Sequence, residues 1–330
     1  MDDKDRQLLG FLRKGITLTP RPFHDLASKT GADSDTSEIF LRLISLREKK
    51  LAGPLTAVLD SQILAYRSVW VAVKIPDSEK EFQQASARFN AHPGVIKSHR
   101  RFHEFNFWFT LILPPTESAE DHLDGLRREP EKMLVLPVIK RFKAGNAVAS
   151  NVSPGFIDFS NQEIEILRKI QEDLPLQDRP FQKWARDLEM TETDFLEVLK
   201  KFTKQGIFKR FAMVFPAEES LNAPQNMIVW QVPEEKQDVV AACISSFPRV
   251  TQCVQGHAFQ EFPYSLYSFH AGKNEEAEKT ALEIQKQIGK WPWVSLPVVS
   301  ESKNSRPFYF PKDLAPWAQS AFAEKILKEV

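Results

Sequence analysis

Cationic and aromatic side chains stand together most densely in residues 97–108, KSHRRFHEFNFW. Arginine and lysine bind carboxylates, and histidine can give up or accept a proton near neutral pH. Alternate side chains of a β-strand share a face. We therefore expect His99, Arg101 and His103 to point the same way, with Lys97 beside them. Such a face combines side chains that hold carboxylates with side chains that transfer protons.

On the same strand, Arg100 and Phe102 would point to the opposite face. The alternative interpretation is a solvent-facing charged strand edge with scattered histidines, because charged residues are mostly exposed in folded proteins. In the second half of the chain, His257 ends the equivalent strand and His270 ends the next one. Each of these two is either a functional histidine or a structural one with its hydrogen bonds satisfied.

Further basic residues stand outside this segment. Lys209 and Arg210 lie where a wing or an interdomain strand would begin, and they are either carboxylate ligands or a solvated basic turn. Arg21 and Arg179 precede prolines at expected helix starts. A cation is unfavourable at the positive end of a helix dipole. We therefore expect a carboxylate partner for each arginine, from the protein or from a ligand.

The composition is that of a globular protein, with 42% hydrophobic and 27% charged residues. No apolar run is long enough for a transmembrane helix, and the acidic N-terminus lacks the apolar core of a secretory signal. The two cysteines, Cys243 and Cys253, cannot form a disulfide framework, so we expect a cytoplasmic protein. Lys+Arg and Asp+Glu number 44 each, and this balance disfavours a dedicated nucleic-acid binder.

The sequence contains an internal duplication. A repeat of this kind constrains the fold more strongly than any single motif. The chain length of 330 residues also favours several modest domains. Three short motifs occur once in each half, namely RPF at 21–23 and 179–181, IP or VP at 75–76 and 232–233, and HP or FP at 92–93 and 247–248.

Each half begins with apolar residues at helical spacing, which predicts three helices over 3–14, 21–30 and 36–50 in the first half. Pro22 and Pro180 suit the first turn of a helix. Asp35 or Thr36, and Thr191, are the expected N-caps. A βαββαβ order follows in both halves, and in the first it closes with one strand in MLVLPVIKRFK.

The fold class predicted from these patterns is α+β, a tandem duplication of a winged-helix-like (helix-turn-helix) module and a ferredoxin-like βαββαβ module. The expected modules are 1–60 (helix-turn-helix-like) and 61–145 (ferredoxin-like), a linker at 146–160, then 161–215 (helix-turn-helix-like), 216–305 (ferredoxin-like) and a C-terminal extension at 306–330.

Four segments of the first half carry a further pattern, namely TPRPFHDLA, LTAVLDSQILAYRSVWVAVKIP, RFHEFNFWFTL and LPVIKRFKAGNAV. Four segments of the second half do the same, namely LPLQDRPFQ, GIFKRFAMV, NMIVWQVPEE and EFPYSLYSFHAG. The order of modules resembles the Lrp/AsnC regulators, and these motifs resemble one branch of them, the siroheme decarboxylase family in its fused two-subunit form.

The resemblance implies removal of two acetate carboxylates from siroheme, giving didecarboxysiroheme in haem d1 or alternative haem biosynthesis. It implies no cofactor beyond the iron tetrapyrrole itself. The implied partners are siroheme or a related tetrapyrrole, and a homo-oligomer or related decarboxylase subunits, with neither nucleic acid nor membrane. The reaction needs a proton donor, most naturally a histidine, and cations that hold the neighbouring carboxylates.

On this resemblance, the expected site residues fall into three groups: catalytic His103, His99 and His257; substrate-binding Lys97, Arg100, Arg101, Lys209, Arg210, Trp108 and Tyr264; and His99 or His257 as ligand of the substrate iron.

The sequence departs from the family pattern at two places. The family usually has an Arg-Arg pair before its G-A-V segment, where the second half has Lys209-Arg210 and the first has Gly53-Pro54. A histidine usually follows the P-G-V turn, and its position is Lys97 in the first half and Gln252 in the second. The two halves therefore differ in the residues they retain.

Two other functions are compatible with the sequence. A transcription regulator would use the helix-turn-helix-like segments, but the expected recognition helix at 36–50 is basic only toward its C-terminal end, and its counterpart after Thr191 begins acidic. A non-catalytic tetrapyrrole-binding protein would keep the lysine and arginine side chains that bind the carboxylates of its ligand, but it would not catalyse decarboxylation.

Overall fold

The computed structural model describes residues 1–30, 36–115, 117–144, 158–215 and 226–312. The chain forms two compact units. We call Met1–Tyr66, Val152–Ala223 and Phe308–Phe310 the helical unit, and Arg67–Asn151, Pro224–Pro307 and Pro311–Val330 the sheet unit. Each unit therefore takes segments from both halves of the sequence.

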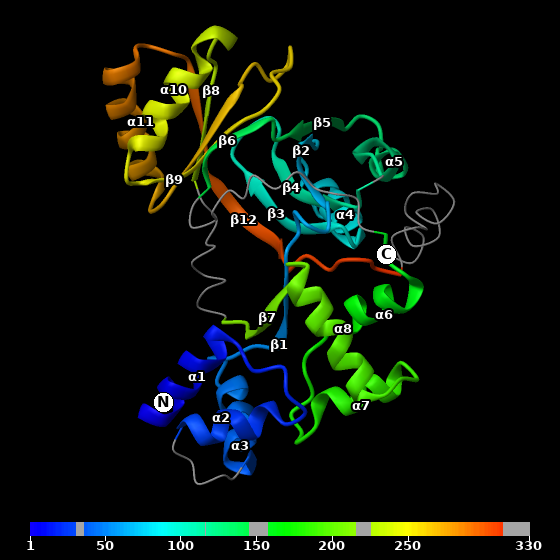
Figure 1. The fold of residues 1–330 in the computed structure, drawn as a ribbon. Coiled ribbons are helices and arrows are strands. Elements are labelled where there is room, and N and C mark those ends of the chain that lie inside the picture. Colours follow the sequence, from blue (N-terminus) through cyan, green and yellow to red (C-terminus); the bar gives the residue numbers. More distant parts are fainter. Residues whose placement is uncertain (31–35, 116, 145–157, 216–225, 313–330) are drawn as a thin grey trace. The chain divides into compact units, whose positions relative to one another are not determined.

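The helical unit contains one three-helix module from each half, joined by an antiparallel strand pair (Figure 1). The first half supplies α1 (Asp3–Lys14), α2 (Pro22–Thr30), α3 (Thr36–Glu48) and β1 (Leu55–Leu59); the second supplies α6 (Asn161–Lys169), α7 (Pro180–Asp187), α8 (Glu192–Lys204) and β7 (Phe208–Met213). Phe23 and Leu43 lie in the same buried cluster as Phe181 and Leu199. The two modules thus share one hydrophobic core.

Local sequence explains where these helices begin. The Thr191 side chain accepts from the backbone N–H of Asp194 and caps α8, as predicted. Pro180 occupies the first turn of α7, where its missing N–H costs no helical hydrogen bond. The three helices predicted in the first half are confirmed, with α3 ending at Glu48. The alternative N-cap Asp35 lies outside the described residues.

The sheet unit contains the βαββαβ order twice, once from each half of the chain, which confirms the predicted α+β fold class. The first half supplies β2 (Arg67–Lys74), α4 (Glu79–Ala91), β3 (Val95–Arg101), β4 (Phe107–Leu113), α5 (Ala119–Leu123) with a 3-10 turn at Asp124–Leu126, and β5 (Lys132–Pro137). The second half supplies β8 (Asn226–Trp230), α10 (Glu234–Ser246), β9 (Val250–Gln255), β10 (Leu266–His270), α11 (Asn274–Ile288) and β11 (Trp293–Leu296).

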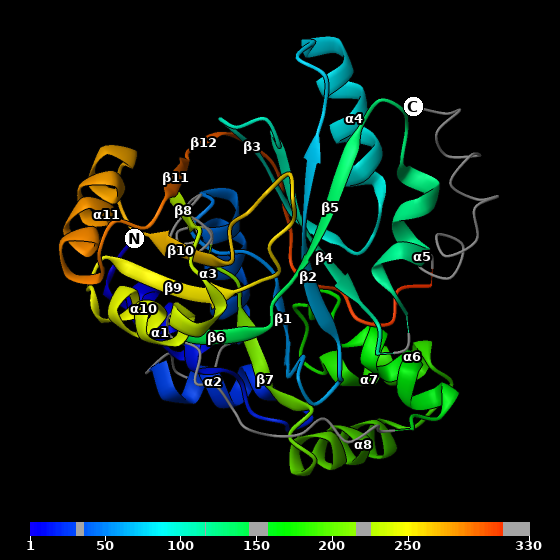
Figure 2. The ribbon, with the colours of Figure 1, turned by 90° about the horizontal axis from the view of Figure 1, so that it is seen from above.

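Each sheet gains a fifth strand from the other half of the chain (Figures 1 and 2). β6 (Lys140–Ala144) pairs antiparallel with β9, and β12 (Val298–Asn304) pairs antiparallel with β3. The strand orders are β12-β3-β4-β2-β5 and β11-β8-β10-β9-β6. The two modules of this unit are therefore tied together by a reciprocal exchange of strands.

This exchange corrects two expectations. The segment MLVLPVIKRFK was expected to close its own sheet as one strand, but it divides after Pro137 into β5 and β6. Pro297 divides β11 from β12 in the same way. Proline has no N–H to donate, so it interrupts the ladder and lets the chain cross to the other sheet. The expected module boundaries at 145 and 305 therefore assign β6 to the first sheet and β12 to the second, whereas each strand belongs to the other sheet.

The two sheets pack against each other through the faces that their helices do not cover. One buried cluster combines Ala72 and Trp108 of the first sheet with Val229, Val254 and Tyr267 of the second. Each helix-covered face has a core of its own, which includes Phe89 and Phe107 in the first sheet. Among the residues that the structure describes, no helix is long and apolar enough to cross a membrane.

Trp108 should be a large contributor to the stability of this unit. It is 5% exposed, its ring lies 5.6 Å from that of Phe262, and its Nε1 donates to the Phe105 carbonyl at 2.8 Å. We expect Trp108→Ala to lower the free energy of unfolding by about 3–5 kcal/mol, as truncation of a buried aromatic does. Urea denaturation would measure the loss. Phe102→Ala is the control, because Phe102 is 77% exposed, and equal losses for both variants would contradict the prediction.

Candidate active site at the β3–β4 turn

His103 lies in the turn that joins β3 to β4. β3 ends at Arg101, whose carbonyl accepts from the His103 backbone N–H at 3.0 Å. His103 therefore lies outside β3, so the strand alternation that was expected to place it on the same face as His99 does not extend to it. The Nδ1 atom of His103 accepts from the backbone N–H of Phe105 at 3.1 Å. In the neutral ring this leaves the proton on Nε2.

Two aromatic rings hold the imidazole of His103. Phe105 stacks on it with ring centroids 6.2 Å apart, and Phe262 meets it edge-on at 5.7 Å. Phe262 comes from the loop between β9 and β10, so the second half of the chain helps to position a histidine of the first. Burial lowers the pKa of His103, while the charge of Glu104 opposes this shift and that of Lys74 adds to it.

His103 lines a cavity of about 860 Å³ at this end of the first sheet. This volume is typical of small-molecule and cofactor sites. Lys74, Lys132, Arg100 and Arg101 line the same cavity. Cations and a histidine thus meet in one space, although they come from the ends of different strands.

The two lysines of the cavity are held by carboxylates of the protein. Lys74 Nζ lies 2.8 Å from Glu104 Oε2, and Lys132 Nζ lies 2.6 Å from Glu261 Oε1. About half of each of these four side chains is exposed. Solvent-exposed ion pairs contribute on the order of 0–1 kcal/mol. A ligand carboxylate can therefore replace either glutamate at little cost.

The alternation expected along β3 is confirmed within the strand. His99 stands opposite Trp108, which faces the other sheet, and Arg100 stands opposite Phe107, which faces the helices. Arg100 accordingly reaches α4, where its Nη1 pairs with Glu79 at 2.6 Å. Its guanidinium also lies 4.2 Å from the centre of the Phe82 ring.

His99 and Arg101 are enclosed by the protein. His99 Nε2 lies 3.4 Å from Glu301 Oε2 on β12, and burial followed by the charges of Arg101 and Lys97 lowers the pKa of His99 to about 4. Arg101 is buried, and its Nη1 donates to the Leu296 carbonyl at 2.5 Å. Burial lowers the pKa of Arg101 to about 10. Both side chains contact segments of the second half, so the strand exchange shapes this face.

Of the two aromatic residues expected to bind substrate, Trp108 packs in the core between the sheets. Tyr264 is half-buried and meets the Phe262 ring edge-on at 4.8 Å. Burial and the charge of Glu104 raise the pKa of Tyr264. Tyr264 therefore lies within electrostatic reach of the β3–β4 turn, whereas Trp108 gives that region its rigid support.

The remaining sequence-predicted residues lie apart from the cavity. His257 follows β9 with its side chain exposed, and its carbonyl accepts from the Tyr267 hydroxyl at 3.4 Å. His270 is buried, its Nε2 lies 2.8 Å from Ser268 Oγ, and burial lowers its pKa to about 4. Among the residues that the structure describes, no three His, Cys, Asp or Glu side chains are grouped to hold a metal ion.

Lys209 and Arg210 belong to the helical unit, where both are exposed on β7. Lys209 Nζ pairs with Asp60 Oδ2 at 2.8 Å. The structure therefore does not assign these two residues to the cavity of the sheet unit. Sequence reasoning missed Lys74 and Lys132, because no local motif marks single charged residues at the ends of separate strands. It also missed Glu104, which lies within 97–108, because only cations, histidines and aromatic residues of that segment were expected to act.

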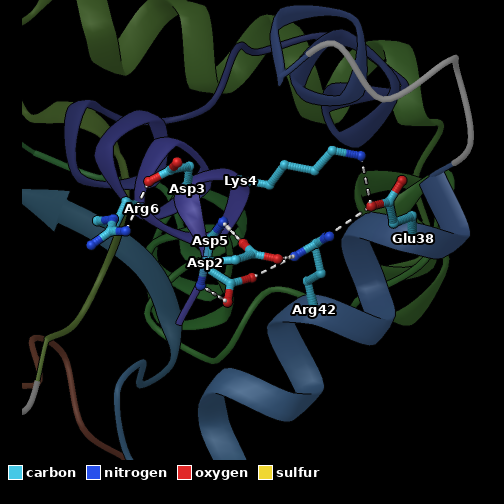
Figure 3. Close-up of polar contacts among 7 residues, drawn as sticks. All are labelled: Asp2, Asp3, Lys4, Asp5, Arg6, Glu38 and Arg42. Atoms are coloured by element: carbon cyan, nitrogen blue, oxygen red, sulfur yellow. Dashed lines mark hydrogen bonds and ion pairs between the residues drawn. The ribbon is translucent and has the colours of Figure 1, made fainter.

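The cations of α3, the expected recognition helix, are paired with carboxylates of the helical unit. Arg42 Nη1 lies 2.8 Å from both Asp2 and Asp5, and its Nε lies 2.9 Å from Glu38 (Figure 3). These partners raise the pKa of Arg42. Nucleic-acid binding depends on cations that can neutralise phosphates. The charge of Arg42 is therefore already compensated by carboxylates of the protein.

Other basic side chains of the helical unit are likewise paired within it. Arg47 on α3 holds Asp173 through two hydrogen bonds of 2.8 and 2.9 Å. Arg21 Nε lies 3.1 Å from Asp178, and Arg179 pairs with Glu192. The carboxylate partners expected for Arg21 and Arg179 are thus supplied by the protein, and the first of these pairs joins the two helical modules.

Two family models match the second half of the chain. Residues 163–208 match the siroheme decarboxylase NirDL-like HTH domain, and residues 223–303 match the AsnC-like ligand binding domain. Both assignments agree with the elements seen in the structure.

Curated relatives and a solved structure extend the match over the whole chain. A siroheme decarboxylase of Hydrogenobacter thermophilus is 28% identical over 96% of this chain and 98% of its own length. A siroheme decarboxylase alpha subunit of Desulfovibrio desulfuricans is 36% identical over 43% of this chain and 81% of its own length. The crystal structure of the siroheme decarboxylase NirDL with an iron-uroporphyrin III analogue covers 99% of both chains, with a TM-score of 0.75 and 27% identity. The chain belongs to the siroheme decarboxylase family.

Proposed function

We propose that this protein is a siroheme decarboxylase, which removes two acetate carboxylates from siroheme to give didecarboxysiroheme. The observation that carries the proposal is the cavity at the β3–β4 turn, where His103 and four cationic side chains line one space. The full-length similarity to the Hydrogenobacter thermophilus siroheme decarboxylase supports it. The products would serve haem d1 or alternative haem biosynthesis.

Each step converts one acetate side chain into a methyl group. The bond between the methylene carbon and the carboxylate breaks, carbon dioxide leaves, and the bonding electron pair stays on the carbon attached to the pyrrole. One proton then adds to that carbon, so each carboxylate lost consumes one proton and no oxidant or reductant. The protein has to stabilise the developing charge and supply that proton.

The cations of the cavity suit the binding half of this task. Lys74 and Lys132 can exchange Glu104 and Glu261 for ligand carboxylates, because both pairs are half-exposed. Arg100 offers a guanidinium to a third carboxylate at the cost of its bond to Glu79. A carboxylate that reacts gains from being held in a site that water leaves while its neighbours stay anchored.

His103 suits the proton-transfer half. In the neutral ring Nδ1 accepts from the Phe105 N–H and Nε2 carries the proton, so the imidazolium forms when a second proton adds at Nδ1 in place of that hydrogen bond, and Nε2 is the atom that delivers a proton to carbon. Burial keeps the ring neutral in the ligand-free protein. The carboxylates of a bound substrate would raise the pKa of His103 and favour the imidazolium that donates to carbon.

The iron is part of the substrate and needs no resident cofactor in this proposal. His99 and His257 remain the two histidines proposed to approach it. The ring of His99 is held by Glu301, whereas that of His257 is exposed. An assembly with a second copy or with related decarboxylase subunits also remains part of the proposal.

Anaerobic incubation of the purified protein with siroheme, followed by mass spectrometry of the tetrapyrrole, tests the activity. We expect the loss of two carboxyl groups as carbon dioxide. A spectral shift of siroheme without loss of mass would instead identify a tetrapyrrole-binding protein without catalysis. Binding of a specific DNA operator, with no effect on siroheme, would favour the regulator that the paired cations of α3 argue against.

A further inference from the structure

Lys74 and Glu104 form an ion pair directly beside His103. Lys74 ends β2 and Glu104 follows His103 in the β3–β4 turn, and all three line the same cavity. Lys74 Nζ lies 2.8 Å from Glu104 Oε2, with about half of each side chain exposed. The pair is therefore both accessible to a ligand and next to the proposed proton donor.

The charges of this pair act on His103 in opposite directions. Glu104 favours its protonated form and Lys74 disfavours it. While the two are paired, their charges largely cancel at the imidazole. The other charged residues that line the cavity are Asp77, Arg100, Arg101 and Lys132. Lys132 pairs with Glu261, and the titratable Tyr264 lies in the facing loop.

A ligand carboxylate changes this balance. When it takes Lys74 as its partner, the cluster of Lys74, Glu104 and the ligand carboxylate carries one more negative charge than before. The added charge stabilises the imidazolium of His103. Ligand binding is thereby linked to the uptake of a proton, which is the reagent that decarboxylation consumes.

We infer that the Lys74–Glu104 pair is a substrate-operated proton loader, in which capture of Lys74 by a substrate carboxylate frees Glu104 to hold the proton on His103. This inference rests on the proposed function for the identity of the ligand, a polycarboxylate macrocycle. Lys74 is a binding residue in this scheme, and Glu104 is a positioning residue that acts through His103. Gln231 occupies the position equivalent to Lys74 in the second half, since Val232-Pro233 aligns with Ile75-Pro76, so the device belongs to the first half.

Two substitutions by glutamine, each of which removes one charge of the pair, test the inference by their opposite effects. Glu104→Gln leaves the positive charge of Lys74 beside His103, so we expect the pH at which His103 titrates to fall. Lys74→Gln leaves the negative charge of Glu104, so we expect that pH to rise. A charge change at this range shifts a titration by on the order of half a pH unit. The double variant, which again has no net charge at the pair, should return close to the wild type.

The readout is the NMR titration of His103 in ligand-free protein labelled with ¹³C and ¹⁵N at histidine, with the signal assigned from His103→Gln. Lys132→Gln and Glu261→Gln are the matched controls, because they break an equally exposed pair beside the same cavity, and the charges that shift the pKa of His103 are those of Glu104 and Lys74. They should move the titration less. Shifts in the same direction for both Lys74→Gln and Glu104→Gln, or no shift for either, would overturn the inference, since a merely structural role cannot produce opposite shifts.

Binding of uroporphyrin III, a macrocycle with eight carboxylates, tests the link to a ligand. Calorimetry in two buffers of different ionisation enthalpy should show net proton uptake near neutral pH, and His103→Gln should abolish it. Binding without proton uptake would overturn the inference even if siroheme is decarboxylated. Opposite shifts together with proton uptake, in a protein that leaves siroheme intact, would support the loader and refute the proposed function alone.

Discussion

Replacing His103 by alanine should lower kcat for siroheme decarboxylation by about 10²- to 10⁴-fold, the range expected when a general acid is removed. KM should change little, because the cations of the cavity remain in place. His103→Gln should be about as inactive, since an amide cannot deliver the proton to carbon. Initial rates measured anaerobically at several siroheme concentrations would separate kcat from KM.

Two controls make this result specific. His24→Ala removes an exposed histidine of the helical unit and should leave kcat unchanged. Near-ultraviolet circular dichroism should be the same for both variants and the wild type. Alanine at His270 is expected to impair turnover less than alanine at His103, although His270 is buried and its loss also affects folding. Full activity of His103→Ala would remove this residue from the mechanism.

The pH dependence of turnover also tests His103 as the proton donor, because this role fixes the direction in which the rate changes with pH. Because burial lowers the pKa of His103 in the free protein, kcat/KM should fall as the pH rises through a value below 6.5. Substrate carboxylates raise the pKa in the complex, so the corresponding decline of kcat should lie at higher pH. Coincident declines would show that bound substrate does not act on the charge of His103.

Acidification from pH 7 to pH 5 should destabilise the protein by several kcal/mol. Burial lowers the pKa of His92 to about 3, that of His99 to about 4 and that of His270 to about 4. The folded protein keeps these rings neutral, while the unfolded chain binds protons as the pH falls below 6.5. Stability is therefore present above pH 6.5 and is lost as the pH falls from there toward 4. Each of the three rings accounts for about 2 kcal/mol of the stability lost between pH 7 and pH 5.

The hydrogen bonds of His92 explain why it stays neutral. Its Nδ1 accepts from the Gly94 N–H at 3.0 Å, and its Nε2 lies 3.2 Å from Nδ1 of the buried His122. His122 Nε2 in turn lies 2.5 Å from Glu117. A proton added to His92 would break the first of these bonds and place a charge where no water reaches it.

Urea unfolding at pH 7 and pH 5 would measure the loss of stability. His99→Gln should reduce the difference between the two pH values by about 2 kcal/mol, since it removes one of the three rings. His24→Gln should leave the difference unchanged, because His24 is exposed. Identical pH dependence for both variants would show that His99 does not carry this effect. Carboxylates with lowered pKa values, such as Asp25 and Glu163, lose their contribution as the pH falls through their ordinary values of 3.8 and 4.5, which lie below this interval, so they do not mask the effect.

Local patterns were sufficient for much of the fold. Helical spacing and capping residues predicted α1 to α3 and the N-cap Thr191, because each depends on residues within one or two turns. The period of two along β3 predicted that His99 and Arg100 point to opposite faces. The same reasoning failed at His103, because it assumed that the strand continued beyond Arg101, where the chain turns back through a local hydrogen bond.

The duplication was visible in the sequence alone, and so was the segment 97–108 that carries His103. What only the tertiary structure decided is which residues join that histidine. The reciprocal exchange of β6 and β12 brings Glu301 to His99 and Leu296 to Arg101, and the second half supplies Phe262 to His103. Lys74 and Glu104 meet across strand ends. Such contacts depend on how distant segments pair and pack, which the spacing of residues along the chain does not encode.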